Sequence, residues 1–97
     1  MTTHYLKTVQ PFFSRVETGD KTAELRRDDR PYEIGDTLVL QEYDKATEKF
    51  SGREITVRIT DITRHKDLLE ILTVSGLVLG WCMLSFRKIN QNFGYEA

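Results

Sequence analysis

Hydrophobic and polar residues alternate along much of the chain, and the alternating stretches are separated by glycine, proline and charged residues. A period of two is typical of a β-strand with one buried face, whereas a short apolar run is typical of a strand buried on both faces. These patterns predict five strands, over His4–Val9, Thr22–Arg27, Thr37–Tyr43, Arg53–Thr63 and Trp81–Phe86. In the second strand, the alternation predicts that Ala23 and Leu25 face the core.

One short helix is predicted between the first two strands. Phe13 and Val16 recur at helical spacing and, with a neighbouring phenylalanine, form one apolar face. A proline at the start suits the first helical position, and Gly19 suits the residue just past the end. We therefore expect a helix over Pro11–Thr18 that covers one side of a sheet.

The predicted elements fit one small domain that spans residues 1–97. No linker, repeat or low-complexity segment divides the sequence, and 97 residues support one hydrophobic core. Five or so strands, one or two short helices and no alternation of strands with long helices predict a mainly β (α+β) fold built on a curled sheet or barrel. We expect a polar hairpin connection over Asp44–Gly52, and a helical turn or folded loop over Arg64–Leu72.

Charge and cysteine content narrow the classes of function. The 14 Lys and Arg residues against 15 Asp and Glu residues give a net charge of −1. That balance argues against a nucleic-acid binder driven by bulk positive charge, but it leaves room for a local basic cleft. The single cysteine, Cys82, rules out an internal disulfide framework and a cysteine-based zinc cage. The two histidines have no ligand-like spacing, so we expect no metal.

No targeting or cofactor motif stands out. The N-terminus lacks the apolar segment of a signal peptide, and the longest uncharged stretch, Ile71–Phe86, is shorter than the ~20 residues that span a bilayer. We therefore expect a cytoplasmic protein that makes no membrane contact. The sequence contains no glycine-rich phosphate loop, nucleophile elbow or paired-carboxylate motif, and we expect no cofactor.

The stretch from Gly19 to Arg26 carries the clearest candidate chemistry. Glu24 and Arg26 share one face of the predicted strand, and Lys21 lies where the helix leads into it. Arginine offers a forked donor, lysine a mobile positive charge, and glutamate an acceptor for amino or amide hydrogens. The three side chains could bind a polar planar ligand, or they could form a solvated ladder of ion pairs, and the residue types alone favour the ladder.

The pattern Gly-x-Lys-x-x-Glu-x-Arg, formed by Gly19, Lys21, Glu24 and Arg26, resembles the signature of the ASCH domains, which are named for homology to an activating signal cointegrator. Further positions resemble a small bacterial and phage subfamily of unknown function: His4-x-Leu6-Lys7, Phe13, Asp29-Arg30, Ile34-Gly35-Asp36, Ser51-Gly52-Arg53 and Gly80-Trp81. The resemblance extends from His4 to Phe86. It implies a PUA-like mixed β-barrel with a cleft between the barrel and a helix.

There are three candidate functions, and the resemblance implies the first two. The first is the binding of RNA or a nucleotide-like molecule in a cleft lined by Lys21, Glu24 and Arg26. A second is amide hydrolysis of an acylated nucleoside such as N-acetylated cytidine. Lys21 matches the lysine of those enzymes, but Glu24 stands where they carry a nucleophilic threonine, so we expect slow hydrolysis or none. A third is a scaffold for protein interactions. The oligomeric state is not predicted.

Several other side chains are candidates to extend the ligand site. They are His4, Lys7 and Arg30, although for His4 we favour a structural role. Tyr5, Tyr32 and Tyr43 could stack on a base, but tyrosine is also common at half-buried strand positions. Trp81 and Cys82 lie in the last apolar run, where we expect core residues.

Overall fold

The computed structural model describes residues 1–65 and 80–89 of the chain. It contains one short helix and five strands: β1 (Thr3–Thr8), α1 (Phe12–Thr18), β2 (Ala23–Arg27), β3 (Thr37–Asp44), β4 (Lys49–Arg64) and β5 (Trp81–Lys88). All six predicted elements are present, and their limits differ from the predicted ones by a few residues. The largest difference is at β4, which begins at Lys49, so the hairpin connection is only residues 45–48. The expected turn over Arg64–Leu72 lies mostly outside the described residues.

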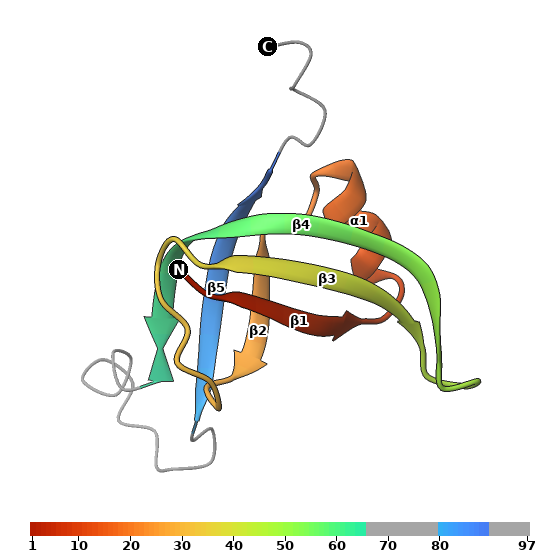
Figure 1. Ribbon diagram of the computed structural model, residues 1–97, viewed down its shortest axis with the longest axis horizontal. Coiled ribbons are helices and arrows are strands. Elements are labelled where there is room, and N and C mark those ends of the chain that lie inside the picture. The colour runs from red at the N-terminus through yellow and green to blue at the C-terminus, as the bar shows by residue number, and fades with distance from the viewer. Residues whose placement is uncertain (66–79, 90–97) are drawn as a thin grey trace, which may run out of the picture.

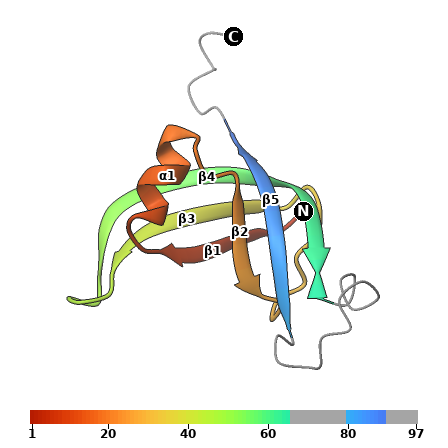
Figure 2. The same cartoon turned by 180° about the vertical axis from the view of Figure 1, so that it is seen from behind.

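The five strands form one curled sheet in the order β1-β3-β4-β5-β2. β1 runs parallel to β3, and the other neighbouring strands are antiparallel. The 16-residue β4 makes the curl possible, because its first part pairs with β3 and its last part, from Val57 onward, pairs with β5. Figures 1 and 2 show α1 and β2 on the same side of the layer formed by β1, β3 and β4. The result is a mainly β half-barrel, as the sequence predicted.

The core fills the concave side of this half-barrel. Alternate residues of the central strands point inward, as predicted for Val57 and Ile59 of β4. Val16 of α1 joins them from the helix side. The buried cluster consists of Leu6, Val16, Tyr32, Leu38, Leu40, Val57, Ile59, Cys82, Leu84 and Phe86. Gly19 ends the helix with φ of 89°, a left-handed conformation that glycine adopts without steric cost.

The orientation of β2 is the reverse of the sequence prediction. Leu25 is 56% exposed and Glu24 only 7% exposed, so the polar residues of this strand point inward. Leu25 lies opposite Met83 of β5, which is also exposed, on the outer face of the sheet. The alternation of β2 was read correctly, but its two faces were assigned the wrong way round. The physical reason is that β2 is an edge strand whose inward face lies toward β1, the other edge strand of the sheet. The carbonyl groups at the free edge of β1 need hydrogen-bond donors.

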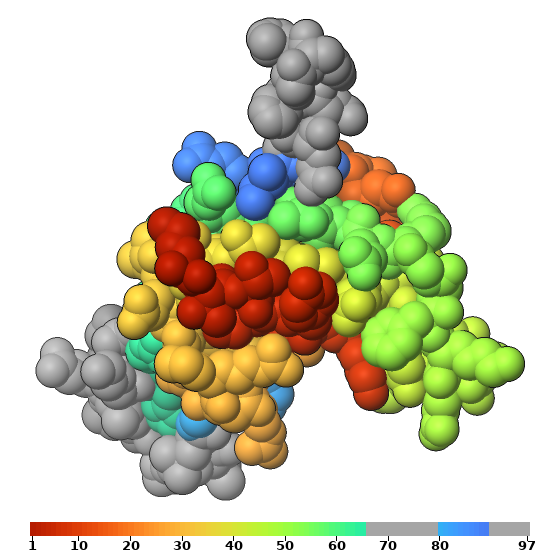
Figure 3. Space-filling model, viewed as in Figure 1, coloured from red at the N-terminus to blue at the C-terminus, as the bar shows by residue number. Residues whose placement is uncertain are grey.

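The two edge strands, β1 and β2, are joined by arginine side chains. In β1 the carbonyl groups of Tyr5 and Lys7 accept hydrogen bonds from arginines across the gap. Arg26 of β2 donates through Nη2 to the carbonyl of Lys7 at 2.5 Å, and Arg30 donates through Nη1 to the carbonyl of Tyr5 at 3.3 Å. Figure 3 shows the segment that follows β2, in orange, lying directly against β1, in red. Side chains rather than a backbone ladder therefore close this seam of the half-barrel.

Candidate functional site

Lys21, Glu24 and Arg26 come together in the structure. Arg26 Nη2 lies 3.0 Å from Glu24 Oε2, and Lys21 Nζ lies 3.8 Å from Glu24 Oε1. The Glu24 side chain is 9% exposed, while the two cations are about a quarter exposed. The three residues thus form one cluster around a buried carboxylate. A solvated ladder would leave all three side chains in water, and the burial of Glu24 does not fit that arrangement.

The local chain path explains how Lys21 reaches this cluster. After Gly19 ends the helix, the backbone N–H of Lys21 donates to the carbonyl of Arg15 at 2.9 Å and turns the chain back along α1. Lys21 Nζ then lies 5.5 Å from the centre of the Phe12 ring, within the range of a cation–π contact. Thr22 enters the sheet next, because its carbonyl accepts a hydrogen bond from the N–H of Phe86 at 2.9 Å.

One oxygen of the Glu24 carboxylate is unsatisfied. Oε1 is buried and accepts no hydrogen bond from residues 1–65 or 80–89, because Lys21 Nζ at 3.8 Å is too distant for one. Buried polar atoms are nearly always hydrogen-bonded in native proteins. An unsatisfied carboxylate oxygen of this kind therefore points to a donor from outside the described residues.

A depression of about 400 Å³ opens beside Glu24 and Arg26. Its walls combine three arginines, two carboxylates, two aromatic rings and two leucines: Leu6, Glu24, Leu25, Arg26, Arg27, Asp29, Arg30, Tyr32 and Trp81. Lys21 is not part of this lining, so it approaches Glu24 from another side. Arginine next to aromatic rings suits an anionic group attached to a flat ring system.

The two aromatic side chains on the wall differ in exposure. Tyr32 is 2% exposed, and burial raises the pKa of its hydroxyl, although nearby Arg30 and Arg26 act in the opposite direction. Trp81 is only half-buried, with the Arg27 guanidinium 6.0 Å from its ring centre. The expectation that Trp81 is a core residue is therefore wrong. It is the first residue of β5, next to the edge strand β2, and it lines the depression.

The loop that carries Arg30 and Tyr32 is tied to the sheet. Arg64 of β4 donates through Nη1 to both oxygens of Asp28 and through Nη2 to the carbonyl of Tyr32, at 2.8 Å. The N–H of Asp28 also donates to the carbonyl of Gly80, just before β5. These contacts hold both ends of the loop, so they fix the wall of the depression to which Tyr32 belongs.

His4 and Lys7 do not enter the depression with their side chains. His4 is 5% exposed, and its Nε2 lies 2.9 Å from Asp36 Oδ2. Its ring packs against Tyr32 with the ring centres 4.8 Å apart, so it supports the wall from behind. Lys7 is exposed, and its Nζ lies 4.5 Å from the centre of the Tyr43 ring, outside the set of residues that lines the depression. Only its carbonyl takes part, as the acceptor for Arg26.

Asp36 forms a buried pair with His4 and accepts three hydrogen bonds. Burial by itself would raise the pKa of this carboxyl, but three hydrogen bonds lower it below its ordinary value. The donors are the His4 ring and the backbone N–H groups of Thr2 and Glu33, the latter two at 3.1 and 3.0 Å. The structure therefore supports the structural interpretation of His4.

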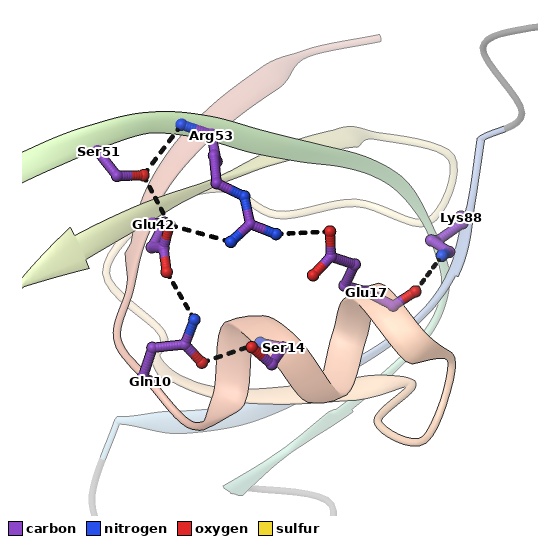
Figure 4. Close-up of polar contacts among 7 residues, drawn as sticks. All are labelled: Gln10, Ser14, Glu17, Glu42, Ser51, Arg53 and Lys88. Carbon is purple, nitrogen blue, oxygen red and sulfur yellow. Dashed lines mark hydrogen bonds and ion pairs between the residues drawn. The ribbon is translucent and has the colours of Figure 1, made fainter.

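A second polar network fixes α1 on the sheet, as Figure 4 shows. Arg53 Nη2 donates to Glu17 Oε2 at 2.6 Å, and its Nη1 lies 3.5 Å from Glu42 Oε1. Gln10 donates to the other oxygen of Glu42 at 2.6 Å, and Lys88 donates to the carbonyl of Glu17, also at 2.6 Å. The network joins the helix to β3, β4 and β5, and it thereby sets the position of the helix end that leads to Lys21.

Sequence reasoning found part of the site and missed part of it. It named Lys21, Glu24, Arg26 and Arg30, but it gave no role to Arg27 or Asp29 and placed Trp81 in the core. A signal existed, because Asp29-Arg30 and Gly80-Trp81 are among the positions that resemble the ASCH subfamily. Ser51 and Arg53 of the second network are also among those positions, but the sequence does not show that they meet residues as distant as Gln10 and Lys88.

Two further observations concern ligands and membranes. Within residues 1–65 and 80–89, no three His, Cys, Asp or Glu side chains gather in a way that could hold a metal ion. In the same part of the chain, no helix has the length and apolar character needed to cross a membrane.

Comparison with known proteins identifies the family. The family described as "Domain of unknown function (DUF3850)" matches residues 3–86. The chain belongs to this family. The chain is also similar to an uncharacterized 12.9 kDa protein in the GpA 3'region of Escherichia phage P2, which is 42% identical over 77 residues, or 79% of this chain and 69% of the phage protein.

A solved structure shares the fold of this DUF3850 chain. The crystal structure of the hypothetical protein PH0355 superposes with a TM-score of 0.58 and covers 90% of this chain and 99% of its own. The sequence identity is 15%, so the likeness concerns the fold alone.

Proposed function

We propose that this chain is an ASCH domain that binds RNA or a nucleotide-like molecule in the depression beside Glu24. The observation that carries the proposal is the composition of the wall, where Arg26, Arg27 and Arg30 stand beside the rings of Tyr32 and Trp81. Guanidinium groups bind phosphate through forked hydrogen bonds, and aromatic rings stack on bases. The motif from Gly19 to Arg26 and the half-barrel fold support the ASCH assignment.

The arginines keep donors available for a ligand. Arg26 uses Nη2 for its contacts with Glu24 and Lys7, and Arg30 uses Nη1 for its contact with Tyr5. Within the described part of the chain, the remaining guanidinium N–H groups of both residues have no acceptor. A phosphate that enters the depression would therefore find unused donors without breaking the seam.

The charge around the depression sets the expected strength and salt dependence. Three arginines face two carboxylates, and the chain as a whole carries a net charge of −1. Affinity should therefore come from a few directed hydrogen bonds. One to three phosphate contacts on a single strand give a slope of log K against log salt of about −0.7 to −2. A steeper slope would indicate a broad basic surface, which the residues of the wall do not provide.

The protein contains its own probe for this experiment, because Trp81 is the single tryptophan and lines the depression. Titration with nucleoside monophosphates and short single-stranded RNAs, followed by tryptophan fluorescence and calorimetry, should give saturable binding. Arg30→Gln should weaken binding roughly 10- to 150-fold, the value of one charge-assisted hydrogen bond. Arg58→Gln removes the same charge from an exposed position on the convex face and is the matched control.

The outcomes of this titration separate the candidate functions. Saturable binding that Arg30→Gln weakens and Arg58→Gln does not would support the proposal. Binding that both variants weaken equally would place the ligand elsewhere on the surface. If no nucleotide or RNA binds, nucleic-acid recognition is wrong and a scaffold for protein interactions becomes the leading function.

A further inference from the structure

Glu24 and Arg26 stand side by side on the wall of the depression, and together they offer an acceptor next to a donor. Arg26 Nη2 donates to Glu24 Oε2 at 3.0 Å, while Oε1 of the same carboxylate is buried and accepts no hydrogen bond from residues 1–65 or 80–89. The terminal torsion of a glutamate side chain is broad, so a small rotation brings a carboxylate oxygen toward the ligand. A ligand N–H group would satisfy an acceptor that the described residues leave without a donor.

The donor half of the pair comes from the guanidinium group. Arg26 Nη2 is occupied by Glu24 and by the carbonyl of Lys7, but Nη1 and Nε have no acceptor in the described part of the chain. Tyr32 and Trp81 line the same depression, and the half-buried Trp81 provides a face against which a planar ring can pack. The edge of that ring would then meet Glu24 and Arg26.

We infer that this depression selects nucleobases in which an exocyclic amino group lies next to a ring nitrogen that accepts hydrogen bonds. The inference rests on the nucleotide binding proposed above. Adenine and cytosine have such an edge: their amino group would donate to Glu24, and their ring nitrogen would accept from Arg26. Hypoxanthine and uracil, bound in the same orientation, set a carbonyl oxygen against the carboxylate and a ring N–H against the guanidinium. Both contacts of a keto base are therefore repulsive.

The contact with Arg26 also fixes what a Glu24→Gln substitution would do. Arg26 and Lys21 both have only donors, but Arg26 Nη2 is at hydrogen-bond distance, 3.0 Å from Oε2, whereas Lys21 Nζ is 3.8 Å from Oε1. Arg26 would therefore keep the amide oxygen of the new side chain on its own side. The amide nitrogen would then occupy the position that Oε1 holds in the native protein. The acceptor for the amino group would become a donor, although the size and shape of the side chain would hardly change.

Two pairs of ligands test the inference, because the members of each pair differ only at this edge. They are AMP against IMP, and CMP against UMP, measured by calorimetry and by the fluorescence of Trp81. The native protein should bind the amino member of each pair roughly 5- to 150-fold more tightly, the usual discrimination of one base-edge contact. Glu24→Gln should reduce this ratio to within about twofold. Glu54→Gln makes the same change at an exposed glutamate of β4 and should retain the native ratio.

The possible results distinguish this inference from the proposed function. Equal affinities within both pairs for the native protein would overturn the base selection and leave nucleotide binding intact. Absence of binding for all four nucleotides would overturn both. A native ratio that persists in a Glu24→Gln protein with an unchanged circular dichroism spectrum would show that Glu24 does not read the base. If that variant does not fold, the ratios of the native protein decide the question alone.

Discussion

Arg26 should contribute more to stability than its partial exposure suggests, and Arg26→Ala tests this. The substitution removes the hydrogen bonds to Glu24 Oε2 and to the carbonyl of Lys7, and it leaves a buried carboxylate with Lys21 as its nearest cation, 3.8 Å away. One charge-assisted hydrogen bond contributes about 1.5–3 kcal/mol, and breaking a buried ion pair costs about 3–5 kcal/mol. Because Arg26 is 25% exposed and Lys21 remains, we expect a loss of about 2–4 kcal/mol.

The measurement is urea unfolding at pH 7, followed by circular dichroism, together with a thermal melt. For a chain of this length, the expected loss corresponds to a decrease in Tm of roughly 10–25 °C. Arg58→Ala, at an exposed position of β4, should change the free energy of unfolding by less than about 0.5 kcal/mol.

A double-mutant cycle separates the ion pair from the loss of the arginine side chain. In Arg26→Ala/Glu24→Gln the buried charge is gone, so the double variant should be more stable than Arg26→Ala alone. If the two substitutions destabilise additively, or if Arg26→Ala costs less than about 0.5 kcal/mol, the carboxylate is solvated in the native protein. The interpretation of Glu24 as a buried acceptor would then be refuted.

Three more predictions concern the core, the pH dependence and catalysis. Leu25→Ala should cost less than about 1 kcal/mol because the side chain is exposed, whereas Leu84→Ala should cost about 2–5 kcal/mol; urea unfolding compares them. The pKa of Asp36 is lowered in the native protein, so its contribution to the free energy of unfolding is present above about pH 4 and is lost as the pH falls further. In Asp36→Asn, the free energy of unfolding should therefore depend less on pH on the acid side. The native protein should hydrolyse N-acetylcytidine far more slowly than ~1 s⁻¹, or not at all, as measured by chromatography of the products. Turnover at that rate, abolished by Lys21→Ala, would show instead that the protein is an amidohydrolase.

The sequence predicted the strands and the helix because their signals are local. The apolar run Leu38–Leu40 of β3 and the apolar face of α1 depend on neighbouring residues only, so they can be read without knowing the fold. The inward direction of β2 depends on which strand lies across the gap, and no local pattern carries that information. A five-residue strand with two apolar and three polar residues fits both orientations, and the usual preference for apolar residues inside gave the wrong one.

The same reasoning explains why the site was found only in part. The motif around Glu24 is contiguous, so the sequence could show it as a group. The rest of the wall comes from β1, from the loop after β2 and from the start of β5, which the fold brings beside β2. Trp81 was assigned to the core on apolar character alone. Its position at the first residue of a strand, next to the sheet edge, is a property of the topology.

The seam between β1 and β2 links the shape of the half-barrel to its chemistry. A closed barrel would satisfy the carbonyl groups of Tyr5 and Lys7 with backbone N–H groups, whereas here the donors are the side chains of Arg30 and Arg26. Long cationic donors at an internal edge require a nearby anion, and Glu24 supplies it for Arg26. The inward polar face of β2 is therefore a consequence of the open seam. Because the arginines of the seam also line the depression, a ligand bound there would contact the groups that hold the two edges together, and binding should raise the free energy of unfolding.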